Sequence, residues 1–273
     1  MLYVPGNRPD FIQHIGTSPA DAFTLDFEDS VPTSEKEHAR LIVSDFLSTK
    51  HDKPIFVRIN NLSDGGVLDI AALDSCHFKG ICYPKCTDVR EIERLFDLLF
   101  HFHRPVHIHL LVETPMAMIK LSELVKASRY ITALIFGAVD FTADMHIKLN
   151  QPLGMEYTWA RQMVACTARA YGLEAIDCPY VNVYDLDGLK VDSEYSSNIG
   201  YTGRLAVHPS QVQSINQSYS PSEDTIRLAK EIVEVFETEA LPKGQASIMY
   251  KGHMIATAVY KNAKGILSNR ERP

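Results

Sequence analysis

Short apolar runs alternate with longer amphipathic stretches between residue 2 and residue 210 of the chain. Most of the runs are rich in Val, Ile, Leu or Phe, and a Gly, Pro, Asp or Asn stands at or near their ends, which is typical of β-strands bounded by turns. The pattern predicts eight strands, at residues 2–6, 21–29, 54–60, 80–85, 106–113, 131–140, 174–180 and 204–210.

The stretches between these strands have the apolar spacing of helices. Helices are expected at residues 34–47, 88–100 and 156–172. In the first of them Ser34 stands at the N-cap position with Glu35 in the first turn, and in the last Gly172 provides a C-cap signal. Strands and helices therefore alternate along most of the chain.

This alternation predicts an α/β fold, a (β/α)8 TIM barrel. Nearly continuous apolar strands indicate that both strand faces are buried, as in a parallel sheet covered by helices. Residues 1–237 have about the length of such a barrel, which typically takes ~250 residues. A doubly wound open sheet is the alternative, but the segment VPGNRPD after the first strand holds one Gly instead of a glycine-rich nucleotide fingerprint. Residues 238–273 are expected to form an extension that packs on the barrel or on a neighbouring subunit.

The composition favours small-molecule chemistry. Of the 273 residues, 45% are hydrophobic and 22% are charged, which is the profile of a globular protein with a full core. The formal net charge of −7 leaves no broad cationic surface for nucleic-acid phosphates or for an anionic membrane. No run of about 18 apolar residues is present, and Pro5 and Gly6 interrupt the N-terminal stretch. A cytoplasmic protein is therefore expected.

The cysteine and histidine positions do not favour a zinc site. The five cysteines are odd in number, scattered and without a CxxC pair, which indicates reduced thiols. Four histidines alternate in HFHRPVHIH, residues 101–109, but the Arg-Pro step in the middle breaks any single helix or strand that would bring the rings together. We interpret this segment as the end of a helix followed by the start of a strand.

Polar residues gather where the predicted strands end. In a parallel barrel the carboxyl ends of the strands form the active-site face. The candidate site residues at these ends are Asp26, Glu28, Asp29, Arg58, Asn60, Lys85, Glu113, Asp140 and His208.

Two of these carboxylates predict a metal site. Glu113 and Asp140 end adjacent strands, and a buried Glu is unfavourable unless a positive charge or hydrogen bonds meet it. Mg²⁺ suits such a pair because it takes one or two protein carboxylates and leaves other positions to water and substrate oxygens. Capping of the next helix is the competing interpretation for either residue alone, and Asp140 has the position of an N-cap.

Arg58 strengthens the functional interpretation. It lies in the strand PIFVRIN, where a buried guanidinium needs an acidic partner that accepts two hydrogen bonds. The carboxylates of the DFED segment or a substrate carboxylate can provide it. For Lys85 and His208, structural and functional roles both remain open.

Several motifs resemble the citrate lyase β-subunit-like family, which is related to the malyl-CoA and citramalyl-CoA lyases. They follow the family order from Val4 to Ser222, and the segments are VPGNRPDF, LDFEDSVPTSEKEHAR, VRIN, PKC, VETPMAM, FGAVDFTADM, YVNVYDLDGL, GRLAVHPSQV and YSPS. The resemblance implies a TIM barrel, an acyl-CoA or acyl-carrier thioester substrate, and a homo-oligomer such as a trimer or a hexamer.

The resemblance also implies residue roles. Glu113 and Asp140 would bind Mg²⁺, with Mn²⁺ also possible, and Glu113 would contact the substrate as well. Arg58 would bind substrate oxygens and take part in catalysis, while Asp26 and Glu28 would orient Arg58 and the metal-bound waters. The implied reaction is cleavage of a 3-hydroxyacyl thioester into an acetyl thioester and a 2-oxo acid.

One departure from the family pattern leaves the function open. Family members often carry an Asp in a C-terminal segment of the form G-x-M-I-D-x-P, whereas this chain has Ala256 at that position. Alanine cannot transfer a proton, so His253, Glu28 or a metal-bound hydroxide would have to act as the acid or base. Two alternatives to the lyase therefore stand: a CoA-independent 2-oxo-acid aldolase, and a non-catalytic metal-binding subunit of a larger complex.

Overall fold

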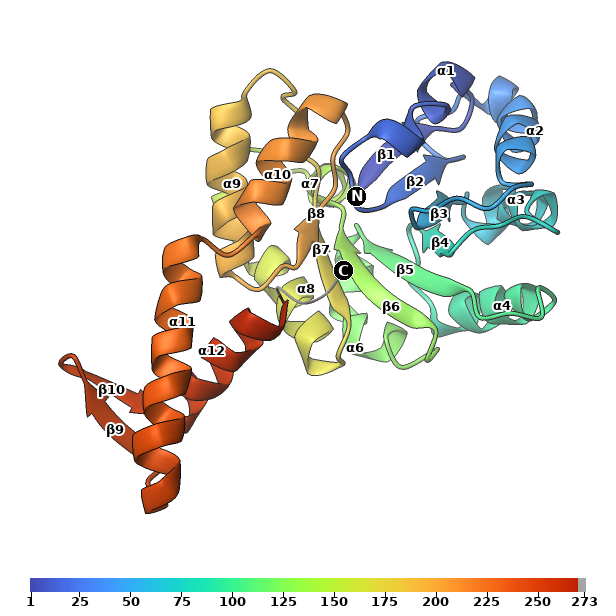
Figure 1. The fold of residues 1–273 in the computed structure, drawn as a ribbon. Coiled ribbons are helices and arrows are strands. Elements are labelled where there is room, and N and C mark those ends of the chain that lie inside the picture. The colour runs from blue at the N-terminus through green and yellow to red at the C-terminus, as the bar shows by residue number, and fades with distance from the viewer. Residues whose placement is uncertain (270–273) are drawn as a thin grey trace. The chain divides into compact units, whose positions relative to one another are not determined.

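Eight parallel strands occupy the centre of the first part of the chain in the computed structural model, which describes residues 1–269 (Figure 1). Two units are distinguished, Met1–Tyr219 and Ser220–Pro273. The strands of the first unit are β1 (Leu2–Pro5), β2 (Phe23–Asp26), β3 (Ile55–Arg58), β4 (Gly80–Tyr83), β5 (His107–Val112), β6 (Ile131–Phe136), β7 (Glu174–Asp177) and β8 (Gly203–Arg204).

Helices surround these strands. They are α1 (Pro9–Ile12), α2 (Lys36–Phe46), α3 (Gly66–Ala72), α4 (Val89–Phe100), α5 (Pro115–Ile119), α6 (Leu121–Leu124), α7 (Ala138–Asp144), α8 (Thr158–Ala170), α9 (Leu186–Asn198) and α10 (Val212–Tyr219). Short 3-10 turns occupy several of the remaining connections, among them Thr33–Glu35 and Pro209–Gln211.

The sheet closes on itself, so the predicted (β/α)8 barrel is confirmed. Neighbours in sequence are neighbours in the sheet, in the order β1 to β8, and each pair is parallel. The first and last strands meet through a parallel bridge between Leu2 and Ala206. Tyr3 N–H donates to the Ala206 carbonyl at 2.9 Å, and Ala206 N–H donates to the Met1 carbonyl at 2.8 Å.

Several predicted boundaries were wrong. The sixth strand ends at Phe136 and not at residue 140, because Gly137 turns the chain into α7. The last strand is reduced to Gly203–Arg204. The predicted N-cap Ser34 lies inside a 3-10 turn, and α2 begins only at Lys36. The C-cap prediction at Gly172 is confirmed, since this residue follows α8 with a φ of 70°.

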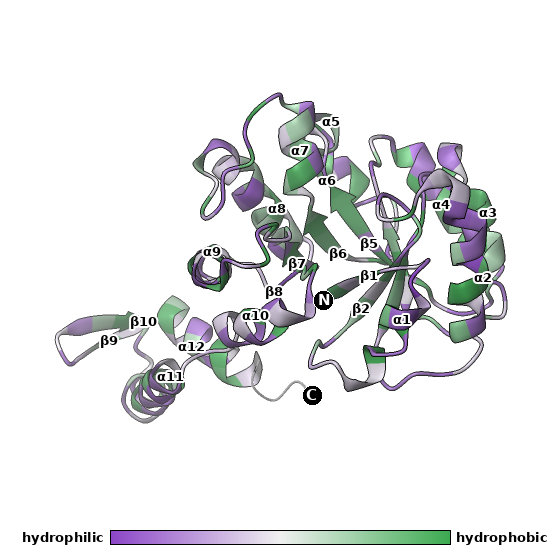
Figure 2. Ribbon diagram, turned by 90° about the horizontal axis from the view of Figure 1, so that it is seen from above, coloured by the Kyte–Doolittle hydropathy of each residue, from purple (hydrophilic) through white to green (hydrophobic). Residues whose placement is uncertain are grey.

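The two faces of the strands build two apolar clusters. A small cluster inside the barrel contains Phe56, Cys82, Leu111, Ile135 and Leu205. The alternate side chains of the same strands belong to a larger cluster shared with the surrounding helices. Figure 2 shows this as hydrophobic colour concentrated on the strands, with mixed colour on the outer helices. Burial on both faces explains why the strands are nearly continuous apolar runs.

A buried ionic cluster joins four elements on one side of the barrel. Arg161 of α8 and Arg204 of β8 are fully buried and ion-pair with Asp177 of β7 and Asp192 of α9. Arg161 Nε donates to Asp177 Oδ1 at 3.0 Å, and Arg161 Nη2 lies 3.0 Å from Asp192 Oδ2. Two positive and two negative charges balance, which makes this burial tolerable.

The second unit has a small core of its own. It contains α11 (Glu223–Val235), a π-helical segment (Phe236–Ala240), the antiparallel strands β9 (Ser247–Tyr250) and β10 (His253–Ala256), and α12 (Thr257–Asn269). Phe236, Ala240 and Ile255 are buried together. The predicted boundary after residue 237 therefore falls inside this unit, because Phe236 and the helix before it pack with the C-terminal segment.

No helix within residues 1–269 combines the length and the apolar character that a membrane crossing requires.

Candidate functional site

The carboxyl ends of β2 to β6 bring together seven of the predicted site residues. Asp26 and Arg58 are the last residues of β2 and β3, and the others stand on the segments that follow β2, β4, β5 and β6. The seven are Asp26, Glu28, Asp29, Arg58, Lys85, Glu113 and Asp140.

Asp26 and Arg58 form a buried two-point ion pair. Register places them side by side on adjacent strands. Arg58 Nε donates to Asp26 Oδ1 and Nη2 donates to Oδ2, both at 2.6 Å. Burial disfavours the charged Asp26 carboxylate, but the charge and hydrogen bonds of Arg58 outweigh this and lower the Asp26 pKa. Three further donors from residues 28 to 30 reach the same carboxylate, so its orientation is fixed.

Glu28 lies between two cations. Its Oε2 atom is 2.8 Å from Arg58 Nη1, and its Oε1 atom accepts a hydrogen bond from Lys85 Nζ at 2.6 Å. Burial raises the pKa of Glu28 above its usual value, although Arg58 and Lys85 act in the opposite direction. Arg58 has five N–H donors, and Asp26 and Glu28 occupy only part of them.

Glu113 is almost completely buried, with 1% of its surface exposed. Its Oε1 atom accepts the main-chain N–H of Lys85 at 2.8 Å. Burial, reinforced by the negative charges of Asp140 and Glu28, raises the pKa of Glu113 to about 8. The position therefore favours a proton or a bound cation over a free carboxylate.

Asp140 lies in the first turn of α7 and is half-buried. Its charge acts on both Glu113 and Lys85, which places it at the same end of the barrel. The competing interpretation of Asp140 as an N-cap is wrong, because Gly137 holds the N-cap position of α7. Capping therefore does not account for Asp140.

Gly137 gives Glu113 its room. A Cβ atom at residue 137 would lie 2.4 Å from Glu113 Cβ and 2.8 Å from Glu113 Oε2. Such distances are shorter than van der Waals contact, so only glycine fits beside this carboxylate.

The donor set of this site fits a hard divalent cation. Glu113 and Asp140 offer oxygen ligands, and two carboxylates are as many as Mg²⁺ usually takes from a protein. No group of three or more His, Cys, Asp or Glu side chains suited to a metal ion occurs within residues 1–269, so a site with more protein ligands is not supported there. The raised pKa of Glu113 supplies the electrostatic reason for a cation at this position.

Two candidate residues have contacts that explain them structurally. Asn60 accepts a hydrogen bond from Lys36 and donates to Asp69 Oδ2 at 2.7 Å and to the Phe27 carbonyl at 3.0 Å. His208 caps the 3-10 turn Pro209–Gln211, where its ring accepts the Ser210 N–H at 3.2 Å. Both side chains therefore organise loops next to strand ends.

The alternating histidines are explained by strand geometry. His109 points into the barrel, is 7% exposed and stacks on Phe56 with ring centroids 3.9 Å apart. Burial lowers its pKa to about 3, so this ring is neutral. His107, two residues earlier, is only half-buried, and His101 and His103 lie on the exposed turn after α4.

Sequence reasoning missed three residues that support the site. Tyr3 packs its ring against Arg58, with the guanidinium carbon 5.2 Å from the ring centroid. Ser30 donates to Asp26, and Gly137 makes room for Glu113. A glycine directly after the apolar run ITALIF was the one available signal, since glycine at a strand end often marks a close approach.

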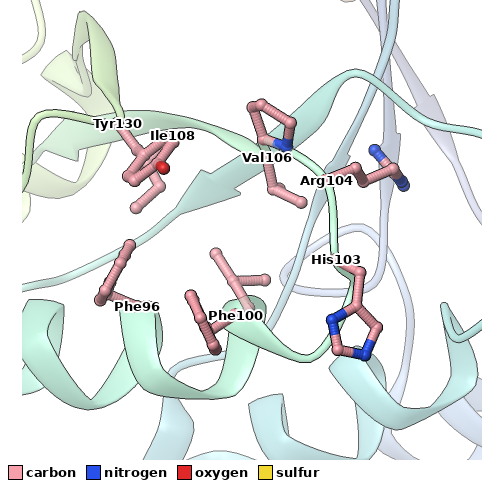
Figure 3. Close-up of a pocket in the computed structure, with 9 residues that line it drawn as sticks. Phe96, Phe100, His103, Arg104, Val106, Ile108 and Tyr130 are labelled. Carbon is pink, nitrogen blue, oxygen red and sulfur yellow. The ribbon is translucent and has the colours of Figure 1, made fainter.

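A cavity lies at the opposite end of the barrel. It has a volume of about 320 Å³ and is lined mainly by apolar and aromatic side chains at the amino-terminal ends of β5 and β6. Figure 3 shows Phe96 and Phe100 pointing from α4 toward Ile108 and Tyr130. The chemistry-bearing residues lie instead at the carboxyl ends, where barrel enzymes place their sites.

Residues 1–209 match the model of the family described as HpcH/HpaI aldolase/citrate lyase. The chain is similar to the citrate lyase subunit beta of Leuconostoc mesenteroides subsp. cremoris, with 30% identity over 98% of this chain and 91% of that protein. It is also similar to the mitochondrial citramalyl-CoA lyase of Rattus norvegicus, with 29% identity over 98% of this chain and 84% of that protein.

A solved structure has the same fold. The protein CitE of Mycobacterium tuberculosis, in complex with magnesium, acetoacetate and coenzyme A, superposes with a TM-score of 0.85. The alignment covers 99% of this chain and 97% of that one, at 22% sequence identity.

Proposed function

Because the chain belongs to the HpcH/HpaI aldolase/citrate lyase family, we propose that it is a Mg²⁺-dependent carbon–carbon lyase acting on a 3-hydroxyacyl thioester. The thioester is of the citramalyl, citryl or malyl type, and the products are an acetyl thioester and a 2-oxo acid. The observation that carries this proposal is the buried Glu113 carboxyl beside Asp140, with the fixed Arg58 guanidinium close by.

Glu113 and Asp140 are the residues that would hold Mg²⁺. When bound, the ion would act as a Lewis acid toward the oxygens of the 2-oxo acid unit. The choice of ion is supported by the Mycobacterium tuberculosis protein of the same fold, which was crystallised with magnesium. The site has more acidic than basic side chains, and this excess of negative charge attracts the ion. The basic side chains are those of Arg58 and Lys85, and the five acidic ones are Asp26, Glu28, Asp29, Glu113 and Asp140.

Arg58 stabilises the charge that develops when the carbon–carbon bond breaks. A base removes the proton of the 3-hydroxyl group, the bond between C2 and C3 breaks, and its electrons move to the thioester carbonyl as an enolate. The free N–H groups of Arg58 are fixed donors for that oxygen, because Asp26 holds the guanidinium in place. Protonation of C2 then gives the acetyl thioester.

Two side chains of this chain are candidates for the acid or base. Ala256 lies in β10, opposite Ser247 of β9, and cannot transfer a proton. Glu28 is a candidate base because burial raises its pKa and it contacts Arg58. His253, three residues before Ala256, is exposed and is the other candidate side chain.

Ala256 also favours a second candidate function. If no other group replaces the missing carboxylate, the site would still bind Mg²⁺ and a 2-oxo acid without cleaving a thioester. The protein would then be a CoA-independent aldolase or a non-catalytic subunit of a larger complex.

We further propose a cytoplasmic homo-oligomer. All five cysteines are free, as expected in a reducing compartment. Several large apolar side chains of the first unit are exposed, among them Ile119, Met155 and Trp159, and another subunit would cover such side chains. The number of subunits would follow from light scattering of the purified protein.

An activity assay tests the function. Purified protein with Mg²⁺ would be incubated with citramalyl-CoA, malyl-CoA and citryl-CoA, and the 2-oxo acid released would be quantified. We expect one thioester to be cleaved, with the activity lost on chelation of the metal and restored by Mg²⁺. If all three thioesters stay intact while Mg²⁺ binds, the lyase proposal is wrong and the second candidate replaces it.

A further inference from the structure

Lys85 connects two carboxylates of the site that follow different strands. It follows β4 by two residues. Its main-chain N–H donates to Glu113 Oε1 at 2.8 Å, and its ammonium donates to Glu28 Oε1 at 2.6 Å. Glu113 follows β5 and Glu28 follows β2. Lys85, which follows β4, therefore contacts one carboxylate beyond the adjacent strand β5 and another beyond β2, on the far side of β3 and Arg58.

The backbone of Lys85 is unusual. Its φ is 53°, in the left-handed region that residues with a Cβ rarely adopt. Five other non-glycine residues within residues 1–269 share a positive φ, so the conformation alone carries no function. Lys85 differs from a simple turn residue because both its main-chain donor and its side-chain donor contact carboxylates of the site.

The ammonium also acts on Arg58 through Glu28. Glu28 contacts Arg58 Nη1 with Oε2 while Lys85 holds Oε1. Without the ammonium, the hydrogen bond at Glu28 Oε1 is lost, and contacts remain at Oε2, to Arg58 Nη1 and to the Asp29 N–H at 3.3 Å. Glu28 would then be held less firmly against Arg58, whereas Asp26 still accepts two hydrogen bonds from the guanidinium.

We propose that Lys85 is a positioning residue whose main-chain N–H orients Glu113 for the metal and whose ammonium holds Glu28 against Arg58. This inference rests on the proposed function, since it concerns the same site. The side chain and the main chain of one residue thus have separate tasks: the N–H serves the metal carboxylate, and the ammonium serves the guanidinium that binds substrate oxygens.

Three substitutions separate these tasks. Lys85→Met removes the charge and keeps most of the side-chain length. Lys85→Arg keeps a cation. Lys85→Gly removes the whole side chain but suits the left-handed conformation and retains the N–H that Glu113 accepts. Lys190→Met is the matched control, because Lys190 is an exposed lysine of α9 paired with Glu194 at 3.8 Å.

Two readouts distinguish positioning from a structural role. Calorimetry measures binding of Mg²⁺ alone and of pyruvate, a 2-oxo acid probe, in the presence of Mg²⁺. Steady-state kinetics with the cleaved thioester give kcat and KM separately. We expect Mg²⁺ affinity of the Met and Gly variants to stay within about 3-fold of wild type, because the N–H to Glu113 remains.

The substrate-side effects should be much larger. In Lys85→Met and Lys85→Gly, pyruvate affinity should fall at least ~10-fold and kcat about 100-fold, the size of effect that follows misplacement of a site group by about 1 Å. Lys85→Arg should recover most of the pyruvate affinity. The Lys190→Met control should match wild type in every measurement.

Wild-type pyruvate affinity and kcat in Lys85→Met would overturn the proposal, as would loss of Mg²⁺ affinity in Lys85→Gly. If wild type binds pyruvate but cleaves no thioester, the proposed lyase function fails, and Lys85 is judged by pyruvate binding alone. If wild type binds neither Mg²⁺ nor pyruvate, both proposals fail.

Discussion

Glu113 is the residue at which burial and charge conflict most directly. Its carboxyl is enclosed at a strand end, with the carboxylates of Glu28 and Asp140 nearby. A bound divalent cation removes the conflict. The same position in a protein without a metal function would be expected to carry an apolar or amide side chain.

Substitution of the two carboxylates tests the metal site. Glu113→Gln and Asp140→Asn keep the shape of each side chain and remove its charge. We expect each to abolish the stabilisation that Mg²⁺ gives the wild type, which by binding linkage reaches ~3 kcal/mol at a metal concentration 100 times the Kd. Urea unfolding with and without Mg²⁺ measures this. Equal Mg²⁺ stabilisation in all three proteins would place the metal elsewhere.

The pKa of Glu113 predicts how the metal-free protein responds to pH. The folded-state pKa is about 8, whereas an unfolded Glu titrates near ~4.3. The folded state therefore binds this proton more tightly, so the contribution to stability is complete below about pH 4 and is lost as pH rises through 8.

We expect the metal-free wild type to lose stability between pH 5 and pH 8.5 relative to Glu113→Gln, which lacks the titrating group. Urea midpoints in chelator at several pH values check this. Mg²⁺ should stabilise the wild type more at pH 8 than at pH 6, because a proton competes with the metal for Glu113. A difference between the two proteins that does not change with pH would contradict the prediction.

Arg58→Lys tests the guanidinium. Lysine keeps the charge but loses the planar fork that binds both Asp26 oxygens and the donors left for a substrate. We expect kcat to fall by at least ~100-fold, the cost of one lost donor to a developing oxyanion. Steady-state kinetics measure it, with circular dichroism to show that the fold is kept. A variant with near-normal kcat would assign Arg58 to structure.

At the scale of elements, the cluster of Arg161, Arg204, Asp177 and Asp192 joins β7, β8, α8 and α9. Balanced charges allow these groups to be buried, but loss of one partner leaves an uncompensated charge without water. The cluster therefore fixes how α8 and α9 pack on β7 and β8.

Asp192→Asn should destabilise the protein by about 3–5 kcal/mol, since both arginines lose an anionic partner. Glu194→Gln, two residues later on the same helix, is the matched control, because Glu194 is exposed and its pair with Lys190 is long. Its effect should stay below ~1 kcal/mol. Chemical unfolding measures both. A small effect at Asp192 would mean that Asp177 alone compensates the two arginines.

Element types were predictable from sequence, and element ends were not. Eight apolar runs became eight strands because burial on both faces requires apolar side chains throughout. The ends depend on contacts that no local pattern records. Gly137, which follows the end of the sixth strand, lies against Glu113 of the preceding strand's end, and a side chain at residue 137 would collide with it.

The same contrast holds for the site. Asp26, Arg58 and Glu113 were identifiable because charged residues at the ends of apolar strands are rare and need partners. The link through Lys85 was not, because it depends on a left-handed backbone that sequence does not indicate. The ionic cluster was missed for a related reason: its four members come from four separate segments.

At the scale of the whole molecule, the second unit carries the position at which the family pattern changes. Ala256 ends β10 in a hairpin with its own small core. The proposed metal ligands and Arg58 belong to the barrel unit, and the second unit has no carboxylate at residue 256.

Ala256→Asp tests whether that change limits catalysis. If the missing carboxylate is the limiting group, lyase turnover should rise by roughly 10²- to 10⁴-fold, the contribution of a positioned general acid or base. Release of 2-oxo acid from each CoA thioester measures it. If wild type is already fast, Glu28→Gln or His253→Ala should be the damaging change instead. Wild type and Ala256→Asp both inert, while still binding Mg²⁺ and pyruvate, would favour the aldolase or subunit alternative.

Closure of the barrel through Leu2 and Ala206 has a consequence for how the chain folds. The partner of β1 on one edge is β2, which follows it closely in the chain, but the other edge has no partner until the segment after β8 has been synthesised. Pairing across so large a sequence separation has a high entropic cost, which slows folding and leaves an open strand edge exposed to other chains. Nascent chains stalled before residue 206 should therefore aggregate more readily than chains released after residue 219.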